Sequence, residues 1–102
     1  MKRLFISQPM NGRTDEDIKD ERDRLARKVS KAIGENVEII DSLFKNKFLN
    51  PKKNSDLQCL GQSLEQMANA DIAYFAKGWR NARGCRIEHE CALAYGIQVK
   101  YE

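Results

Sequence analysis

Short apolar runs alternate along this chain with longer segments of helical periodicity, and the alternation predicts an α/β fold. Four runs have the length of buried strands: residues 2–7, 37–40, 71–76 and 97–101. Three segments between them carry apolar side chains at helical spacing: residues 15–33, 56–68 and 85–95. Strands that alternate with helices form a parallel sheet covered by helices. We therefore expect a single α/β domain in which flanking helices cover a small parallel sheet of about four strands, with the first strand central.

Capping residues mark the ends of the expected helices. Thr14 precedes the first helix, and Asp17 stands at the third helical position as an analogue of the capping box. Gly34 is expected to end this helix, Ser55 to cap the second and Gly96 to end the third.

The length and composition describe one domain, residues 1–102. A chain of 102 residues can form a single core but leaves no room for a separate substrate domain. Its 41% hydrophobic and 32% charged residues are typical of a soluble protein, and no apolar run approaches the roughly 20 residues of a membrane span. The three cysteines are odd in number and lack paired spacing, which argues against disulfides and favours the reducing cytoplasm.

The charge and the polar side chains exclude several functions. A net charge of +3 weakly favours small anions and is too low for binding a nucleic acid polymer. His89 is the only histidine and the cysteines lack ligand spacing, so we expect no metal and no cofactor. The basic connection from Asp41 to Asn54 is long enough to form a lid or an unstructured loop.

The most informative stretch is Gly-Cys-Arg-Ile-Glu, residues 84–88, at the expected start of the third helix. Ligands of parallel sheets bind at the carboxyl ends of the strands, and this helix follows such an end. Glu88 is therefore a candidate nucleophile for sugar chemistry, because an oxocarbenium-like centre needs a nearby carboxylate. The alternative is a glutamate that only interacts with the helix dipole. His89 points about 100° away around the helix, and we expect it to be structural or to face another subunit.

Four segments in the same order resemble a known family. They are Phe5-Ile6-Ser7-Gln8-Pro9-Met10, Ala70-Asp71-Ile72, residues 78–89 and Ala94-Tyr95-Gly96-Ile97. With them the chain resembles the nucleoside 2-deoxyribosyltransferase superfamily, especially its short bacterial and phage members, and the related 2′-deoxynucleoside 5′-phosphate N-hydrolases. The resemblance implies a single flavodoxin-like or Rossmann-like domain that cleaves the N-glycosidic bond of a deoxynucleoside or its 5′-monophosphate.

The resemblance also implies two catalytic residues. Glu88 falls on the family's glutamate, which attacks the anomeric carbon before the sugar passes to a second base or to water. Asp71 matches the family's second acidic residue and is the candidate for protonating or recognising the leaving base. The alternative for Asp71 is a structural residue at the start of a strand.

The remaining candidate site residues lie in two loops, which we expect to meet Glu88 and the start of the third strand at one edge of the sheet. The first resembles the family's sugar-binding loop, where backbone N–H groups hold a hydroxyl or phosphate. In the second, Trp79 can stack on a base and Arg80, Arg83 and Arg86 can hold a phosphate. The alternatives are a tryptophan that packs the loop and arginines that solvate it. The candidate substrate-binding residues are Ser7, Gln8, Pro9, Met10, Gly12, Gly78, Trp79, Arg80, Asn81, Arg83 and Gly84.

Two positions depart from the family pattern. Phe5 replaces a tyrosine whose hydroxyl orients the nucleophile, and Ala82 replaces a side chain that holds the 5′ end of the substrate. These departures favour an alternative function, a nucleotide-binding or sequestering module without turnover. A third interpretation is an interaction protein with a vestigial site. The exposed sheet edges and helix faces of so small a domain predict a homo-oligomer.

Overall fold

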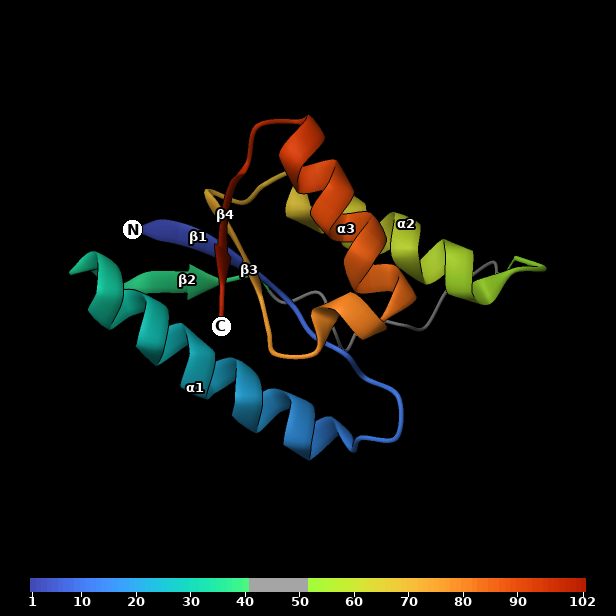
Figure 1. The fold of residues 1–102 in the computed structure, drawn as a ribbon, viewed down its shortest axis with the longest axis horizontal. Coiled ribbons are helices and arrows are strands. Elements are labelled where there is room, and N and C mark those ends of the chain that lie inside the picture. The colour runs from blue at the N-terminus through green and yellow to red at the C-terminus, as the bar shows by residue number, and fades with distance from the viewer. Residues whose placement is uncertain (41–51) are drawn as a thin grey trace.

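Four parallel strands form one sheet in the computed structural model, which describes residues 1–40 and 52–102 (Figure 1). The elements in chain order are β1 (Lys2–Ser7), α1 (Asp15–Ile33), β2 (Val37–Ile39), α2 (Ser55–Met67), β3 (Ile72–Phe75), the 3₁₀ turn η1 (Trp79–Asn81), α3 (Arg83–Ala94) and β4 (Gln98–Tyr101). The strand order is β2-β1-β3-β4, and every pair is parallel. The structure confirms the expected α/β class and the central position of β1.

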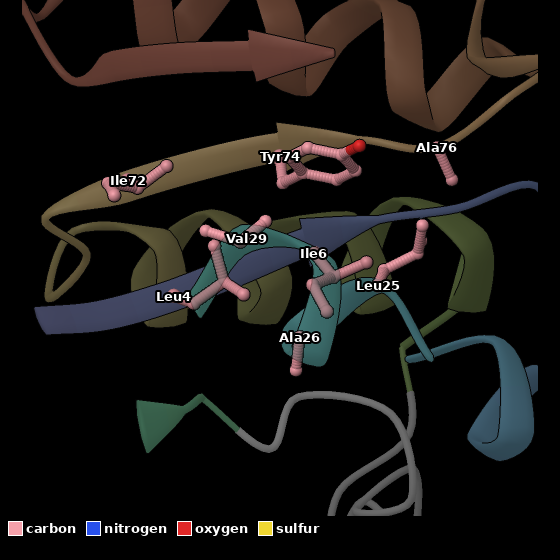
Figure 2. Close-up of a cluster of buried hydrophobic side chains, with 8 residues drawn as sticks. All are labelled: Leu4, Ile6, Leu25, Ala26, Val29, Ile72, Tyr74 and Ala76. Atoms are coloured by element: carbon pink, nitrogen blue, oxygen red, sulfur yellow. The ribbon is translucent and has the colours of Figure 1, made fainter. Parts of the chain in front are cut away.

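Helices cover both faces of the sheet. Successive side chains of β1 point to opposite sides and therefore pack against different helices. Leu4 and Ile6 pack with residues of α1 in one buried cluster, which Figure 2 shows between α1, β1 and β3. Phe5 belongs to a second cluster with Met67 of α2 and Ala92 of α3. The layers are therefore α1, the sheet, and then α2 with α3 (Figure 1).

The helix ends follow the capping residues, with two corrections. The Thr14 side chain accepts the backbone N–H of Asp17 at 3.1 Å, as expected. Asn54 caps α2 in place of Ser55, because its amide oxygen accepts the backbone N–H of Leu57 at 2.9 Å. The third helix begins at Arg83, two residues earlier than the sequence predicts.

The expected basic connection is largely outside the described residues, since the structure describes it only from residue 52. No helix in the two described segments is long and apolar enough to cross a membrane.

Candidate active site

The carboxyl ends of three neighbouring strands place a row of side chains beneath α3. Ser7 of β1 pairs in register with Phe75 of β3, which pairs with Tyr101 of β4. Paired residues of neighbouring strands point to the same face of a sheet. Residues of α3 contact this row: Glu88 and Cys85 contact Ser7, and His89 contacts Phe75 and Tyr101. The row and α3 together define the candidate site.

Within the described part of the chain, one hydrogen bond holds Glu88 in this site. The Ser7 hydroxyl donates to Oε1 of Glu88 at 2.6 Å, and both side chains are buried, with Glu88 8% exposed. Among the described residues, no other group donates a hydrogen bond to this carboxylate and none forms an ion pair with it. Burial raises the pKa of Glu88 to about 7, although the Ser7 hydrogen bond acts in the opposite direction.

The position of Glu88 in α3 argues against the alternative based on the helix dipole. Because α3 begins at Arg83, Glu88 lies in its second turn. The effect of the dipole falls off within the first turn, where the free N–H groups are. The contact with Ser7, rather than the end of the helix, therefore determines the surroundings of this carboxylate.

Cys85 lies one turn before Glu88 on the same side of α3 and is buried. Burial raises the pKa of its thiol to about 11; a hydrogen bond with Ser7 lowers it, and the charge of Glu88 raises it further. The thiol therefore stays protonated at neutral pH and is a poor nucleophile. It forms part of the wall beside the Ser7–Glu88 pair.

The loop after β1 is fixed by polar contacts that the sequence did not predict. Nε2 of Gln8 donates to the carbonyl of Ile18 at 3.2 Å and to the Glu21 carboxylate at 2.8 Å. Arg13 donates to the same carboxylate at 2.9 Å and to the carbonyl of Pro9 at 3.0 Å. Helical periodicity does not show which polar residues of α1 meet a distant loop, and Glu21 is such a residue. Oε1 of Gln8 is buried and has no hydrogen-bond partner in the described part of the chain.

The two candidate loops meet at the carboxyl edge of the sheet, as expected. Gly78 has a φ of +88°, and a Cβ there would lie 3.6 Å from Cγ of Pro9. Asn81 donates its backbone N–H to the carbonyl of Gly78 at 3.0 Å, which closes η1. Met10 is exposed, and Gly12 has a φ of +75° in the turn that leads to α1. Loop residues before α1 and before α3 thus contact each other beside the site.

The structure favours the packing role of Trp79. Its ring centroid lies 4.2 Å from that of His89, 5.4 Å from that of Phe75 and 5.8 Å from that of Tyr101. The guanidinium carbon of Arg80 lies 5.3 Å from the ring centroid of Trp79. Nε2 of His89 lies 2.6 Å from the Tyr101 hydroxyl, which fixes the other side of the cluster. The tryptophan therefore anchors η1 to the sheet, and His89 packs in the same cluster, as the structural one of its two expected roles requires.

The three arginines of this region make different contacts. Arg86 donates to the carbonyl of Arg80 at 3.0 Å, and Arg83 lies 3.7 Å from the exposed carboxylate of Asp56. All three side chains belong to exposed residues, and Gly84 lies in the first turn of α3. The structure does not bring the three guanidinium groups into contact with Glu88.

Asp71 does not lie at the candidate site, and the expectation that the start of the third strand joins Glu88 is wrong. Its carboxylate accepts the backbone N–H of Arg3 at 2.7 Å, and its own N–H donates to the carbonyl of Arg3 at 2.9 Å. Parallel strands begin at the same edge of a sheet, so Asp71 is separated from Phe75 by roughly 13 Å of extended strand. Its observed role is the alternative one, a structural contact at the start of β3.

No group of three or more histidine, cysteine, aspartate or glutamate side chains that could hold a metal ion occurs among residues 1–40 and 52–102. The family model described as "Domain of unknown function (DUF4406)" matches residues 2–101 of the chain. Comparisons with curated proteins and with solved structures find no match.

Proposed function

We propose a function from the site and from the resemblance described above, since the chain belongs to the DUF4406 family and the description of that family names no activity. The proposed reaction is cleavage or transfer at the N-glycosidic bond of a deoxynucleoside or its 5′-monophosphate, with Glu88 as the nucleophile. The observation that supports it is the buried carboxylate of Glu88, which Ser7 orients and no described cation neutralises.

The electrostatics of Glu88 suit a reaction that develops positive charge. The transition state of glycosidic bond cleavage resembles an oxocarbenium ion. A carboxylate in a poorly solvated site interacts more strongly with that charge than one in water does. In the proposed mechanism Ser7 holds Oε1, and Oε2 attacks the anomeric carbon as the bond to the base breaks.

Phe5 stands where the resembling family has a tyrosine, so the tyrosine hydroxyl is missing here. In this proposal the hydroxyl of Ser7 takes its place. Phe5 is buried in the cluster beneath α2 and α3, and Ser7 lies two positions later on the same face of β1. The hydroxyl therefore reaches the nucleophile from the same strand, although from another residue. In this proposal Ser7 is a positioning residue, and its role in substrate binding is through Glu88.

Gln8 is the residue of the first loop that is best placed to bind a sugar hydroxyl. Its amide nitrogen is used by Ile18 and Glu21, while the buried Oε1 lacks a donor in the described part of the chain. A buried acceptor without a donor costs about 1–3 kcal/mol, which a ligand hydroxyl can recover. The proposal gives no catalytic role to Asp71, because it lies at the other edge of the sheet.

The test is base release from deoxynucleosides and deoxynucleoside monophosphates, followed by chromatography with and without an acceptor base. Glu88→Gln keeps the size of the side chain and removes the nucleophile, so product formation is expected to fall to background. Glu90→Gln changes an exposed glutamate of the same helix and is the matched control. Absence of base release by the unaltered protein with every substrate would refute the proposed reaction.

A nucleotide-binding module without turnover is the second candidate. Ala82 stands at the start of α3 and offers no side-chain hydrogen bond to that helix end or to a ligand's 5′ end. This candidate predicts that a nucleoside monophosphate raises the melting temperature without releasing base. A complete screen of nucleotides without any thermal shift would count against it.

The proposal includes a homo-oligomer in the cytoplasm, where nucleotides are available. Tyr95, directly after α3, is 84% exposed, and Leu57 of α2 is 63% exposed. A groove of about 480 Å³ lies between these helices and is lined by Leu64, Met67, Ala68, Cys91, Tyr95 and Ile97. Exposed apolar residues around such a groove favour association. Light scattering of the purified protein, and of Tyr95→Lys as the variant expected to dissociate, tests this part.

A further inference from the structure

Among the described residues, the buried carboxylate of Glu88 has no positive partner. Within the described residues, its hydrogen-bond donor is the neutral hydroxyl of Ser7. The ion pairs of the described segments use other carboxylates: Arg3 pairs with Glu38, Arg13 with Glu21, Arg24 with Glu21 and Glu102, and Arg83 with Asp56. The site thus contains a negative charge that the rest of the described fold does not neutralise.

A buried carboxylate in this situation has two ways to reduce its electrostatic cost. It can bind a proton, and burial accordingly raises the pKa of Glu88 to about 7. It can also bind a cation, which removes the need for the proton. The hydroxyl of Ser7 binds Oε1 only, and no described group donates a hydrogen bond to Oε2.

We propose that the Glu88 site selects ligands with a positive charge on a ring atom that faces the carboxylate, and that binding of such a ligand releases the proton of Glu88 to solvent. The protonated carboxyl and the cation are exchanged for a carboxylate–cation pair and one free proton, so charge and protons balance. The inference rests on the proposed function in one respect, because it takes Glu88 as the residue that faces the sugar ring.

The groups around Glu88 make it the side chain that exchanges this proton. On β1 the neighbour is Ser7, whose hydroxyl does not titrate near neutral pH, and on β3 it is Phe75 in the same row. On α3 the thiol of Cys85 has a pKa raised to about 11 by burial and stays protonated. The next residue, His89, packs against Trp79 and contacts Tyr101 with its ring.

The test compares two ligands of nearly equal shape by isothermal titration calorimetry. The charged probe is 3-(hydroxymethyl)pyrrolidine, an aliphatic amine that, like lysine with a pKa of about 10.4, stays protonated at neutral pH. The neutral probe is 3-(hydroxymethyl)tetrahydrofuran, in which an oxygen replaces the ammonium group. Titrations near pH 6 and near pH 8.5, each in two buffers of different ionisation enthalpy, give the number of protons released.

The charged probe is expected to bind at least about ten-fold more tightly than the neutral one, which corresponds to about 1.4 kcal/mol. Its binding is expected to release close to one proton near pH 6 and almost none near pH 8.5. Glu88→Gln is expected to lose the preference and the proton release, whereas Glu90→Gln keeps both. Equal binding of the probes, binding of neither, or a preference that survives Glu88→Gln would overturn the inference.

The result is separable from that of the base-release assay. A cation preference together with absent base release supports the inference and refutes the proposed reaction. Base release that depends on Glu88 without any cation preference supports the proposed reaction and refutes the inference.

Discussion

The hydroxyl of Ser7 donates a hydrogen bond of 2.6 Å to the carboxylate of Glu88, and this contact joins residues 81 positions apart in the chain. It places a glutamate of α3 over the carboxyl end of a central strand, where ligands of parallel sheets bind. The properties proposed for the site depend on this pair.

Replacing Ser7 with alanine is expected to raise the pKa of Glu88 further, because the hydrogen bond from Ser7 favours the charged form. The pH at which the carboxylate becomes reactive, or binds a cation, therefore moves upward. The midpoint of the pH profile of base release or of probe binding measures this shift. Ser30→Ala, which removes a hydroxyl bound to the carbonyl of Glu35, is the control, and an unchanged midpoint in Ser7→Ala would contradict the prediction.

The free energy of unfolding is expected to decrease as pH rises, because of Glu88. Its pKa is about 7 in the folded protein against an ordinary value of 4.5, so the folded state binds more protons between these values. Stability therefore decreases as pH rises through this window, by about 3 kcal/mol from this residue alone.

Glu88→Gln removes this dependence and is expected to be more stable than the unaltered protein near pH 8, with a smaller difference near pH 5. Urea unfolding at both pH values measures the difference in free energy of unfolding. A difference that is the same at both pH values would show that the carboxylate does not titrate in this window.

Glu102 gives a pH dependence of opposite sign. Burial by itself raises its pKa, but the backbone N–H of Lys77 at 2.8 Å and Arg24 at 3.1 Å outweigh burial, and the net shift is downward. Its stabilising contribution is therefore present above the ordinary pKa and is lost as pH falls through the lowered one. Glu102→Gln is expected to cost about 0.5–1 kcal/mol at pH 7, as for a solvent-screened ion pair, and little at acidic pH, measured by urea unfolding. Equal losses at both pH values would argue against a charged contact.

Gly78 is expected to tolerate alanine poorly because of its backbone. With a φ of +88°, a side chain there is strained, although the space beside Pro9 allows ordinary contact at 3.6 Å. Gly78→Ala is expected to lower the free energy of unfolding by about 1–2 kcal/mol. Gly61→Ala, in α2 with open space around it, is the matched control and is expected to stabilise by about 0.5–1 kcal/mol. Thermal unfolding of both variants distinguishes them by sign.

Asp71→Asn is expected to affect stability and leave base release unchanged. The substitution weakens the contact with the backbone N–H of Arg3 at 2.7 Å, which lies at the opposite edge of the sheet from Glu88. Kinetics of the purified variant, next to its free energy of unfolding, separate the two effects. Loss of base release in a variant of normal stability would restore a catalytic role for Asp71.

The order of strands and helices follows from the sequence, because local periodicity and capping depend on neighbouring residues. Residues 2–7 form β1 as expected, and Thr14 caps α1. The third helix begins two residues earlier than expected because its start carries no side-chain cap, and a position without a cap leaves no local signal.

Some properties of the candidate site were decided by tertiary structure. The sequence singled out Glu88, since an acidic residue after a glycine-bounded loop is visible locally. It did not show that the hydroxyl of Ser7 reaches this carboxylate or that Glu21 and Arg13 fix the first loop. It also did not show that the ring of Trp79 packs against the rings of His89 and Tyr101.

Asp71 shows the physical reason most clearly. The sequence places Asp71 correctly at the start of β3. The four residues of this strand, however, separate its start from its carboxyl end by more than the reach of a side chain. The sequence by itself determined which residues form the sheet and which glutamate follows it. Only the tertiary structure decided which side chains share its carboxyl edge, because strand register and helix packing bring together residues that are far apart in the chain.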